Sequence, residues 1–301
     1  MVQKILMTTL INNLKQTRKE INALFLKELE SLPMRANEIN IAMEYTFISD
    51  GKALRPFLVL TIANALNLDK ESAYRIALAL EMVHTYSLIH DDLPCMDNDT
   101  LRRGKPTCHI KFSESTAVLT GDALLTKAFE ILANTHSLPA IIRCELISYL
   151  AKCAGPSGMI GGQVMDLSGE KVPLSLDEIY QMQLMKTGAL LTFACTAPAK
   201  AAQTDTITLK ALENYANAIG LLFQITDDLL DATGDEKTVG KTLQKDKKAK
   251  KSTFLSFNGL DYTKKLAQEI HSKAIKALDV PLLKKNILLH ELADFILTRK
   301  Y

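Results

Sequence analysis

Residues 70–92 read KESAYRIALALEMVHTYSLIHDD, with apolar side chains at the three- and four-residue spacing of an α-helix. This spacing predicts a long helix that is buried on several sides. The chain continues as LPCMDND at residues 93–99, where Pro94 is expected to end the helix and let Asp97 fold back toward Asp91. The stretch therefore predicts a buried helix that carries a group of carboxylates at its C-terminal end.

The same spacing recurs through most of the chain, whereas sustained alternation with a period of two is rare. The predicted helices cover residues 10–31, 36–48, 54–66, 70–92, 114–134, 138–154, 176–200, 207–232, 261–277 and 281–298. Ser175 followed by Glu178 has the spacing of a capping box and marks one helix start. No low-complexity linker divides the chain, so we expect a single all-α domain of long helices, residues 1–301.

Composition excludes several classes of protein. The 301 residues contain 36 Lys+Arg against 34 Asp+Glu, a net charge of +2, which argues against a nucleic-acid-coating protein or a disordered tail. No apolar stretch approaches the roughly 20 residues that cross a bilayer, so no integral membrane association is expected. The five cysteines form an odd number without a CxxC pair, and no export signal is visible, so we expect a cytoplasmic protein with reduced thiols.

A second acidic group, TDDLLD at residues 226–231, lies near the end of another long helical pattern. Asp227 and Asp231 are four residues apart and therefore share a helix face. Hard oxygen ligands in this number suit Mg²⁺, which commonly links protein carboxylates to substrate phosphates. A simpler explanation is that exposed helix ends carry solvated aspartates, but two such groups, each following a long apolar helix, favour a metal site.

Basic residues accompany the first acidic group. Arg102 and Arg103 follow it, and the segment GKALRP at 51–56 offers Lys52 and Arg55 at a helix start. The planar fork of arginine suits phosphate groups because it donates paired hydrogen bonds. His84 lies seven residues before Asp91, about 10 Å along the same helix face. A core role for His84 is the alternative, but the neighbouring carboxylates favour a ligand contact.

These segments resemble motifs of the trans-polyprenyl diphosphate synthases. SLIHDDLPCMD at 87–97 with LRRGKPT at 101–107 looks like the family's first aspartate-rich motif, and FQITDDLLD at 223–231 looks like the second. Four further segments appear in the family's order: GKALRP at 51–56, GGQ through Asp166, KTG at 186–188 and the segment from Gly234 to Lys241. The first motif has two extra residues, and an aromatic residue, Tyr86, lies just before it. In both features the sequence resembles the bacterial farnesyl diphosphate synthases.

The resemblance implies an all-α fold of long helices around a central cavity, with the two acidic groups facing each other across its mouth. It implies a homodimer that joins isopentenyl diphosphate head-to-tail to an allylic diphosphate, with three Mg²⁺ ions. By residue matching, the main Mg²⁺ ligands are Asp91, Asp97 and Asp227, supported by Asp92, Asp228 and Asp231. The isopentenyl diphosphate site would comprise Lys52, Arg55, His84 and Arg103, and the allylic diphosphate would contact Arg102, Lys186, Lys241 and Lys251.

The chemistry explains why a carbocation site is also needed. Ionisation of an allylic C–O bond leaves a delocalised cation, which partial negative charge without a strong nucleophile can stabilise. Thr187 and Gln224 carry suitable oxygens, and Gly188 is expected to loosen its helix and free the carbonyl of Lys186. An ordinary packing glycine is the alternative. Lys241 closes a Gly-Asp-x-x-Thr-x-Gly-Lys pattern near the second acidic group, and this loop is expected to cover the substrate and exclude water.

Product length is expected to depend on Tyr86, which lies five residues, or about 7.5 Å, before Asp91. An aromatic ring there would form the floor against which a growing chain stops; the alternative is that it only fills the core. A C15 product is expected, with a geranylgeranyl diphosphate synthase as the alternative.

The sequence fits three other classes of protein less well. A di-iron protein would need two Glu-x-x-His motifs, and Glu81-x-x-His84 is the only one in the sequence. A non-catalytic prenyl synthase subunit would usually lose one aspartate motif, and both are present. A terpene cyclase would not require Lys52, Arg55 and His84 for a second diphosphate.

Overall fold

The computed structural model describes residues 2–32, 37–48, 51–233 and 253–299, and these are predominantly helical. The helices are α1 (Val2–Glu30), α2 (Asn37–Phe47), α3 (Leu54–Ala65), α4 (Lys70–Asp91), α5 (Cys108–Lys111), α6 (Glu114–Ala133), α7 (Ala140–Ala154), α8 (Met159–Gly169), α9 (Leu176–Gln183), α10 (Ala189–Ala201), α11 (Thr206–Thr233), α14 (Phe254–Ala277) and α15 (Ile287–Thr298). A π-helical segment, η2 (Leu184–Gly188), joins α9 to α10. The described strands, β1 (Leu101–Arg102) and β2 (Lys105–Pro106), form a two-stranded antiparallel hairpin.

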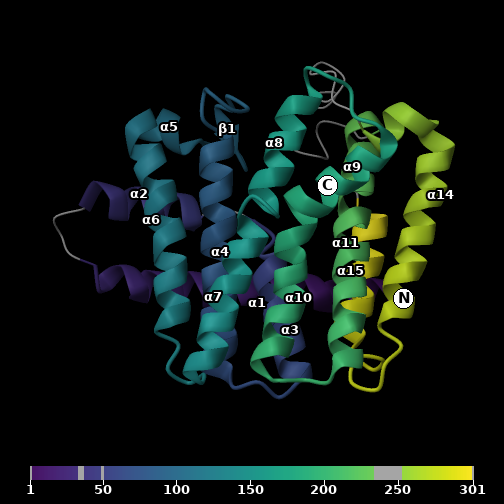
Figure 1. Cartoon of the computed structure of the whole chain (residues 1–301), viewed down its shortest axis with the longest axis horizontal. Helices are drawn as coiled ribbons and strands as arrows, with labels where there is room; N and C mark the ends of the chain where they lie inside the picture. The colour runs from purple at the N-terminus through teal and green to yellow at the C-terminus, as the bar shows by residue number, and fades with distance from the viewer. Residues whose placement is uncertain (1, 33–36, 49–50, 234–252, 300–301) are drawn as a thin grey trace.

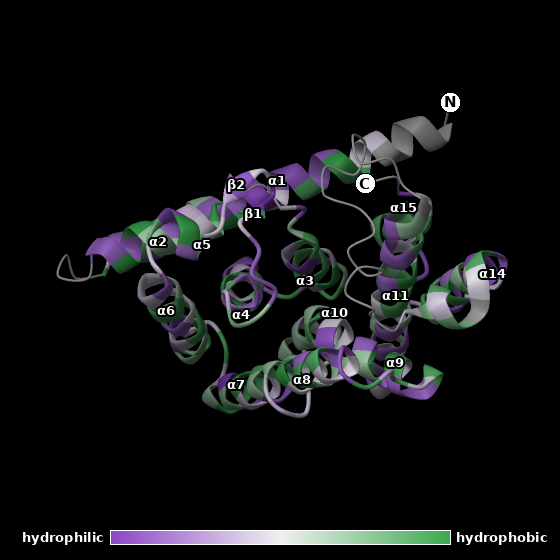
Figure 2. Cartoon of the chain, turned by 90° about the horizontal axis from the view of Figure 1, so that it is seen from above, coloured by the Kyte–Doolittle hydropathy of each residue, from purple (hydrophilic) through white to green (hydrophobic). Residues whose placement is uncertain are grey.

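The long helices run side by side in one domain, and α1 crosses them (Figures 1 and 2). Seen from above, α3, α4 and α10 lie inside a ring that includes α6, α7, α8, α11 and α15 (Figure 2). Most residues of α10 are buried, and buried residues occur on all sides of α4. A helix that is apolar all round belongs in the interior, as the sequence predicted for residues 70–92.

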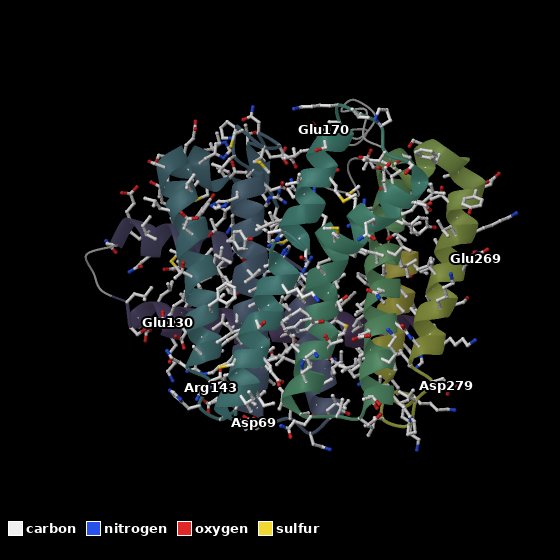
Figure 3. All side chains as sticks on the ribbon, in the orientation of Figure 1. Asp69, Glu130, Arg143, Glu170, Glu269 and Asp279 are labelled. Carbon is white, nitrogen blue, oxygen red and sulfur yellow. The ribbon has the colours of Figure 1, made fainter. Side chains whose placement is uncertain are left out.

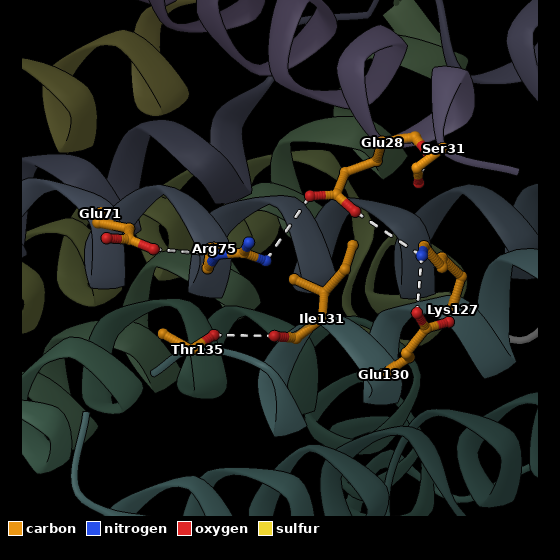
Figure 4. A network of polar contacts seen from close by, with 8 residues as sticks. All are labelled: Glu28, Ser31, Glu71, Arg75, Lys127, Glu130, Ile131 and Thr135. Atoms are coloured by element: carbon orange, nitrogen blue, oxygen red, sulfur yellow. Dashed lines mark hydrogen bonds and ion pairs between the residues drawn. The ribbon is translucent and has the colours of Figure 1, made fainter. Parts of the chain in front are cut away.

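A polar network ties three of these helices together. Glu28 on α1 forms two ion pairs (Figure 4). Its Oε1 lies 3.6 Å from Arg75 Nη1 of α4, and its Oε2 lies 3.7 Å from Lys127 Nζ of α6. Arg75 also reaches Glu71, and Lys127 also reaches Glu130. The network thus links the crossing helix α1 to the first half of α4.

The C-terminal ends of α4 and α11 lie at the same end of the domain. Asp69, which precedes α4, lies at the lower end in Figure 3, whereas Glu170, which follows α8, lies at the upper end. Because α4 starts at the lower end, it carries Asp91 upward. Phe254, the first residue of α14, donates its backbone N–H to Asp228, and α14 descends to Asp279 at the lower end. The two acidic groups therefore share the upper end.

Helix α8 was not predicted from the sequence. Gly161, Gly162 and Gly169 lower the helix propensity of this segment. The structure shows why glycine is there: a Cβ added at Gly162 would lie 2.2 Å from the backbone nitrogen of Lys186. Gly162 allows the close approach of α8 to η2, so a tertiary contact outweighs the poor helix propensity of this glycine.

Several helix boundaries also differ from the prediction. The first helix begins at Val2, and the predicted helix 176–200 is divided by η2. Helix α14 begins at Phe254, ahead of the predicted residue 261, with a bend at Gly259 where φ is 71°. The last helix begins at Ile287 rather than 281, because Asn286 caps it by accepting from the N–H of Leu289. Within the described ranges, no helix is both long and apolar enough to span a bilayer.

Candidate active site

The first acidic group has the folded-back geometry that the sequence predicted. The backbone N–H of Asp97 donates to the carbonyl of Asp91 at 2.9 Å, so the chain reverses after Pro94. Gln163 of α8 donates its side-chain amide to Asp91 Oδ1 at 2.6 Å. Asp91 is half-buried and Asp97 is exposed. The turn therefore brings these two residues together at the end of α4.

Asp92, the second residue of the pair, points into the protein. It is 3% exposed, and Arg102 Nε lies 2.8 Å from both of its carboxylate oxygens, with Arg102 Nη2 at 2.6 Å from Oδ1. Burial raises the pKa of Asp92, and the guanidinium of Arg102 opposes that rise. This forked pair anchors the β1–β2 hairpin to α4. Arg102, expected to contact the allylic diphosphate, is thus already engaged by Asp92.

The second acidic group also has one buried and one half-buried aspartate in its pair. Asp228 is 7% exposed, and its Oδ2 accepts the N–H of Phe254 at 3.0 Å, which holds the N-terminus of α14. Asp227 is half-buried, and its Oδ1 accepts from Arg299 Nη2 at 2.9 Å. Asp231, one turn later on α11, is also half-buried. Each aspartate of the two pairs therefore has its own donor, which offsets the repulsion between neighbouring carboxylates.

The carboxylates fit Mg²⁺ only when a substrate supplies further oxygens. In the ranges that the structure describes, no three Asp, Glu, His or Cys side chains gather to hold a metal ion. Mg²⁺ is commonly bound by one or two carboxylates together with substrate phosphates and water. Asp91, Asp97 and Asp227 provide oxygen donors of this kind at the surface of the upper end. The donor set therefore suits diphosphate-bound Mg²⁺ better than an ion held by protein alone.

A basic cluster lies along α4 below the first acidic group. Arg55 Nη1 lies 3.2 Å from His84 Nε2, and because a guanidinium can only donate, His84 must be the neutral acceptor. Burial lowers the pKa of His84 well below its usual range, and the charges of Arg55 and Arg103 add to this effect. Burial also lowers the pKa of Arg55 to about 10, so it stays charged at neutral pH. The cluster presents fixed positive charge suited to a diphosphate.

Glu81 joins this cluster, a role that the sequence analysis missed. Burial raises its pKa, and Arg55, Arg103 and Arg18 oppose that rise. Its Oε2 is buried without a hydrogen-bond partner among the described residues. The signal in the sequence is that Glu81 lies three residues before His84 and so shares its helix face; the sequence analysis interprets this spacing only as a di-iron motif.

The segment that begins at Gly51 makes room for Arg103 and supplies a further cation, Lys52. A Cβ added at Gly51 would lie 2.4 Å from Arg103 Nη1, so the missing side chain makes room for that guanidinium. Lys52 extends toward α15, with its Nζ 5.8 Å from the ring centroid of Phe295. Lys52 therefore lies beside α15 at the start of α3, the helix that carries Arg55.

The η2 segment confirms that the helix is loosened around Gly188. Residues Leu184–Gly188 form a π-helical turn, a distortion common at functional sites. Lys186 Nζ donates to Asp166 Oδ2 of α8 at 2.6 Å. A Cβ on Gly220 would lie 3.2 Å from the Cα of Gly188, so α11 packs closely on this turn. Gln224, one turn further along α11, is half-buried.

Tyr86 lies in the core one turn before His90. It is 5% exposed, and its ring meets that of His90 edge-on, with centroids 5.7 Å apart. Burial raises its pKa to about 12, and its hydroxyl has no hydrogen-bond partner among the described residues. Its position fits a floor below the first acidic group, and that role stays a prediction.

Comparison with known proteins identifies the family. The polyprenyl synthetase family matches residues 36–282. The chain belongs to the polyprenyl synthetase family. The farnesyl diphosphate synthase of Haemophilus influenzae is 41% identical over 294 residues, covering 95% of this chain and 97% of that protein.

Two solved structures share the fold of this chain. The apo structure of an FPP/GFPP synthase from Zymomonas mobilis superposes with a TM-score of 0.87 at 39% identity, covering 97% of this chain and 99% of that one. A Helicobacter pylori geranyltransferase, complexed with magnesium and isoprenyl diphosphate, has a TM-score of 0.80 at 34% identity, with 96% of each chain covered. The all-α, isoprenoid-synthase type of fold expected from the sequence is confirmed.

Two predicted lysines of this polyprenyl synthetase are not described by the structure, and one arginine at the site was not predicted. Lys241 and Lys251 lie outside the described residues. Arg299, by contrast, was missed: it follows α15 and binds Asp227 across 72 positions of sequence. No local pattern signals such a contact, because nothing near Arg299 in the sequence resembles a motif.

Proposed function

We propose that this polyprenyl synthetase is a farnesyl diphosphate synthase, which joins isopentenyl diphosphate to dimethylallyl or geranyl diphosphate. The observation that carries the proposal is the pairing of two acidic groups at one end of the domain with the basic cluster of Arg55, His84 and Arg103 on the flank of α4. One diphosphate needs the metal-binding carboxylates, and a second diphosphate needs the fixed cations. The matching relatives support the same assignment.

The proposed reaction has three steps: ionisation, condensation and elimination. The allylic C–O bond breaks, and pyrophosphate leaves with the bonding electrons. The double bond of isopentenyl diphosphate attacks the resulting cation and forms a new C–C bond. Loss of a proton then regenerates a double bond, and the released pyrophosphate is the proton acceptor. The protein thus stabilises the leaving group and the cation and excludes water.

Residues of this chain have separate parts in that sequence. Asp91, Asp97 and Asp227 would hold Mg²⁺, with Asp92, Asp228 and Asp231 in support, and three ions are expected with diphosphate bound. Bound Mg²⁺ supplies Lewis-acid stabilisation of the departing pyrophosphate.

The other proposed contacts distinguish the two substrates. Lys52, Arg55, His84 and Arg103 would bind isopentenyl diphosphate, and Arg102, Lys186, Lys241 and Lys251 the allylic diphosphate. Thr187, Gln224 and the carbonyl of Lys186 would face the carbocation. The π-helical turn supports the last role, because it departs from the regular i→i−4 pattern at this residue.

The decisive experiment is incubation of the purified protein with isopentenyl diphosphate and either dimethylallyl or geranyl diphosphate, with Mg²⁺ or with a chelator. We expect Mg²⁺-dependent formation of a C15 product, measured by chromatography and mass spectrometry. Absence of condensation would reject the enzyme assignment. A C20 product would replace it with geranylgeranyl diphosphate synthase.

Asp91→Ala and Asp227→Ala test the metal ligands. Each is expected to lower kcat by about 10³-fold or more, since stabilisation of the leaving group is lost, while circular dichroism stays unchanged. Asp279→Asn is the matched control, because Asp279 lies at the opposite end of the domain and is 67% exposed. Wild-type rates in both alanine variants would contradict the assignment.

We also propose that the whole chain, 1–301, acts as one unit, in a homodimer in the cytoplasm. The five cysteines are unpaired, which supports a reducing compartment. Exposed apolar side chains on one edge of the domain, Ile110 of α5 and Val118 and Leu119 of α6, support a partner surface.

A further inference from the structure

Arg299 is buried against the second acidic group. Its side chain is 3% exposed, and its Cζ lies 3.8 Å from the centroid of the Phe223 ring. Nε and Nη2 donate to Thr226 Oγ1 at 3.2 and 2.8 Å, and Nη2 also donates to the carbonyl of Phe223 at 2.6 Å. These contacts fix the guanidinium, and its Nη2 also donates to Asp227 Oδ1 at 2.9 Å.

This contact determines the orientation of the Asp227 carboxylate. Arg299 approaches Oδ1, and none of the described residues makes a hydrogen bond or ion pair with Oδ2. The side chain of Asp227 is 34% exposed, so part of it remains in contact with solvent. An ionised carboxylate has about four acceptor positions, and an arginine that occupies one leaves others for a cation.

We propose that Arg299 is a positioning residue for Mg²⁺ binding at Asp227. It holds one carboxylate oxygen and thereby presents the other to the ion that arrives with pyrophosphate. The inference rests on the metal role proposed for Asp227. It makes the affinity of the second acidic group depend on the docking of the end of α15.

Two physical effects oppose each other here. Fixing the carboxylate in advance removes part of the cost of ordering this side chain when the metal binds. The positive charge of Arg299 repels a second cation, but the negative charge of Asp227, 2.9 Å away, offsets it. We therefore expect preorganisation to outweigh repulsion.

The test is calorimetric titration of inorganic pyrophosphate into the full-length protein at fixed Mg²⁺, which needs no turnover. Arg299→Met is expected to weaken pyrophosphate binding by up to about tenfold, because the carboxylate must then be ordered on binding. Asp227→Asn should weaken it by itself, and adding Arg299→Met to Asp227→Asn should cause no further loss. Wild-type binding by Asp227→Asn would reject the metal role of Asp227 separately.

Three other variants sharpen the test. Arg299→Lys keeps the charge without the planar fork and is not expected to restore binding. Thr226→Val removes one acceptor of the guanidinium and should weaken pyrophosphate binding less than Arg299→Met does. This variant keeps the proposal testable if Arg299→Met folds poorly. Arg75→Met is the matched control, since Arg75 is also ion-paired but lies in the first half of α4 (Figure 4), and it should bind pyrophosphate normally.

Opposite results would overturn the proposal. Tighter binding by Arg299→Met would show that repulsion dominates. Full rescue by Arg299→Lys would show that charge alone matters. An equal loss in the presence and absence of the Asp227 carboxylate would assign Arg299 a purely structural role.

Discussion

Tyr86 combines a buried ring with a hydroxyl that lacks a partner among the described residues. Tyr86→Ala is expected to lengthen the product beyond 15 carbons, because it removes the ring below the first acidic group. Tyr86→Phe is the matched control: it keeps the ring, should retain the product and should not lower stability, since only an unsatisfied hydroxyl is lost. Mass spectrometry of the products checks both, and an unchanged product with alanine would remove Tyr86 from this role.

His84 predicts a pH dependence of stability. The folded protein holds it neutral, whereas in the unfolded chain it takes up a proton near pH 6.5. Because the unfolded state then binds more protons, this residue's contribution is present above pH 6.5 and is lost as the pH falls toward 5. The loss is up to about 1.4 kcal/mol per pH unit.

Urea unfolding of the wild type and His84→Gln between pH 7 and 5 isolates this contribution. The free energy of unfolding should fall less steeply for His84→Gln, since glutamine does not titrate. Parallel curves would show that His84 is not held neutral in the folded protein.

At the scale of elements, the contact between α8 and η2 depends on Gly162. Gly162→Ala places a Cβ 2.2 Å from the nitrogen of Lys186, so α8 must move. We expect a loss of about 1–3 kcal/mol in the free energy of unfolding, together with reduced turnover because Lys186 and Thr187 shift. Denaturant titration and steady-state kinetics measure the two effects.

Gly188→Ala is the matched control for that contact. Its added Cβ would meet its nearest neighbours at 3.6 Å, an ordinary van der Waals distance, and its φ is −65°. Stability should therefore be kept or raised, given the better helix propensity of alanine. Equal losses in both glycine variants would mean that the close approach at Gly162 is not the cause.

For the whole molecule, the partner surface on α5 and α6 can be tested directly. Val118 and Leu119 are 40% and 55% exposed, and we expect a dimer of the 33.3 kDa chain that Val118→Lys with Leu119→Lys converts to a monomer. Ile287→Glu is the control, since Ile287 is 62% exposed at the start of α15. Sedimentation equilibrium distinguishes the species, and a dimer that survives both lysines would place the interface elsewhere.

Local patterns predicted much of this molecule. The helix predicted over 70–92 is observed at Lys70–Asp91, and Asp97 folds back as Pro94 indicated. Helix periodicity and proline geometry act over a few residues, so they can be read from the sequence. The same reasoning failed for α8, where glycine's weak helix propensity concealed a packing requirement set by Lys186, far away in the sequence.

The sequence by itself determined the all-α class, the two acidic groups and their basic companions, because residue type and helical spacing are local properties. Only the tertiary structure decided which carboxylates point outward. Asp92 and Asp228 are buried against Arg102 and the start of α14, while Asp227 is held by Arg299. These contacts join segments that are 10, 26 and 72 residues apart, and whether such groups meet depends on how whole helices pack.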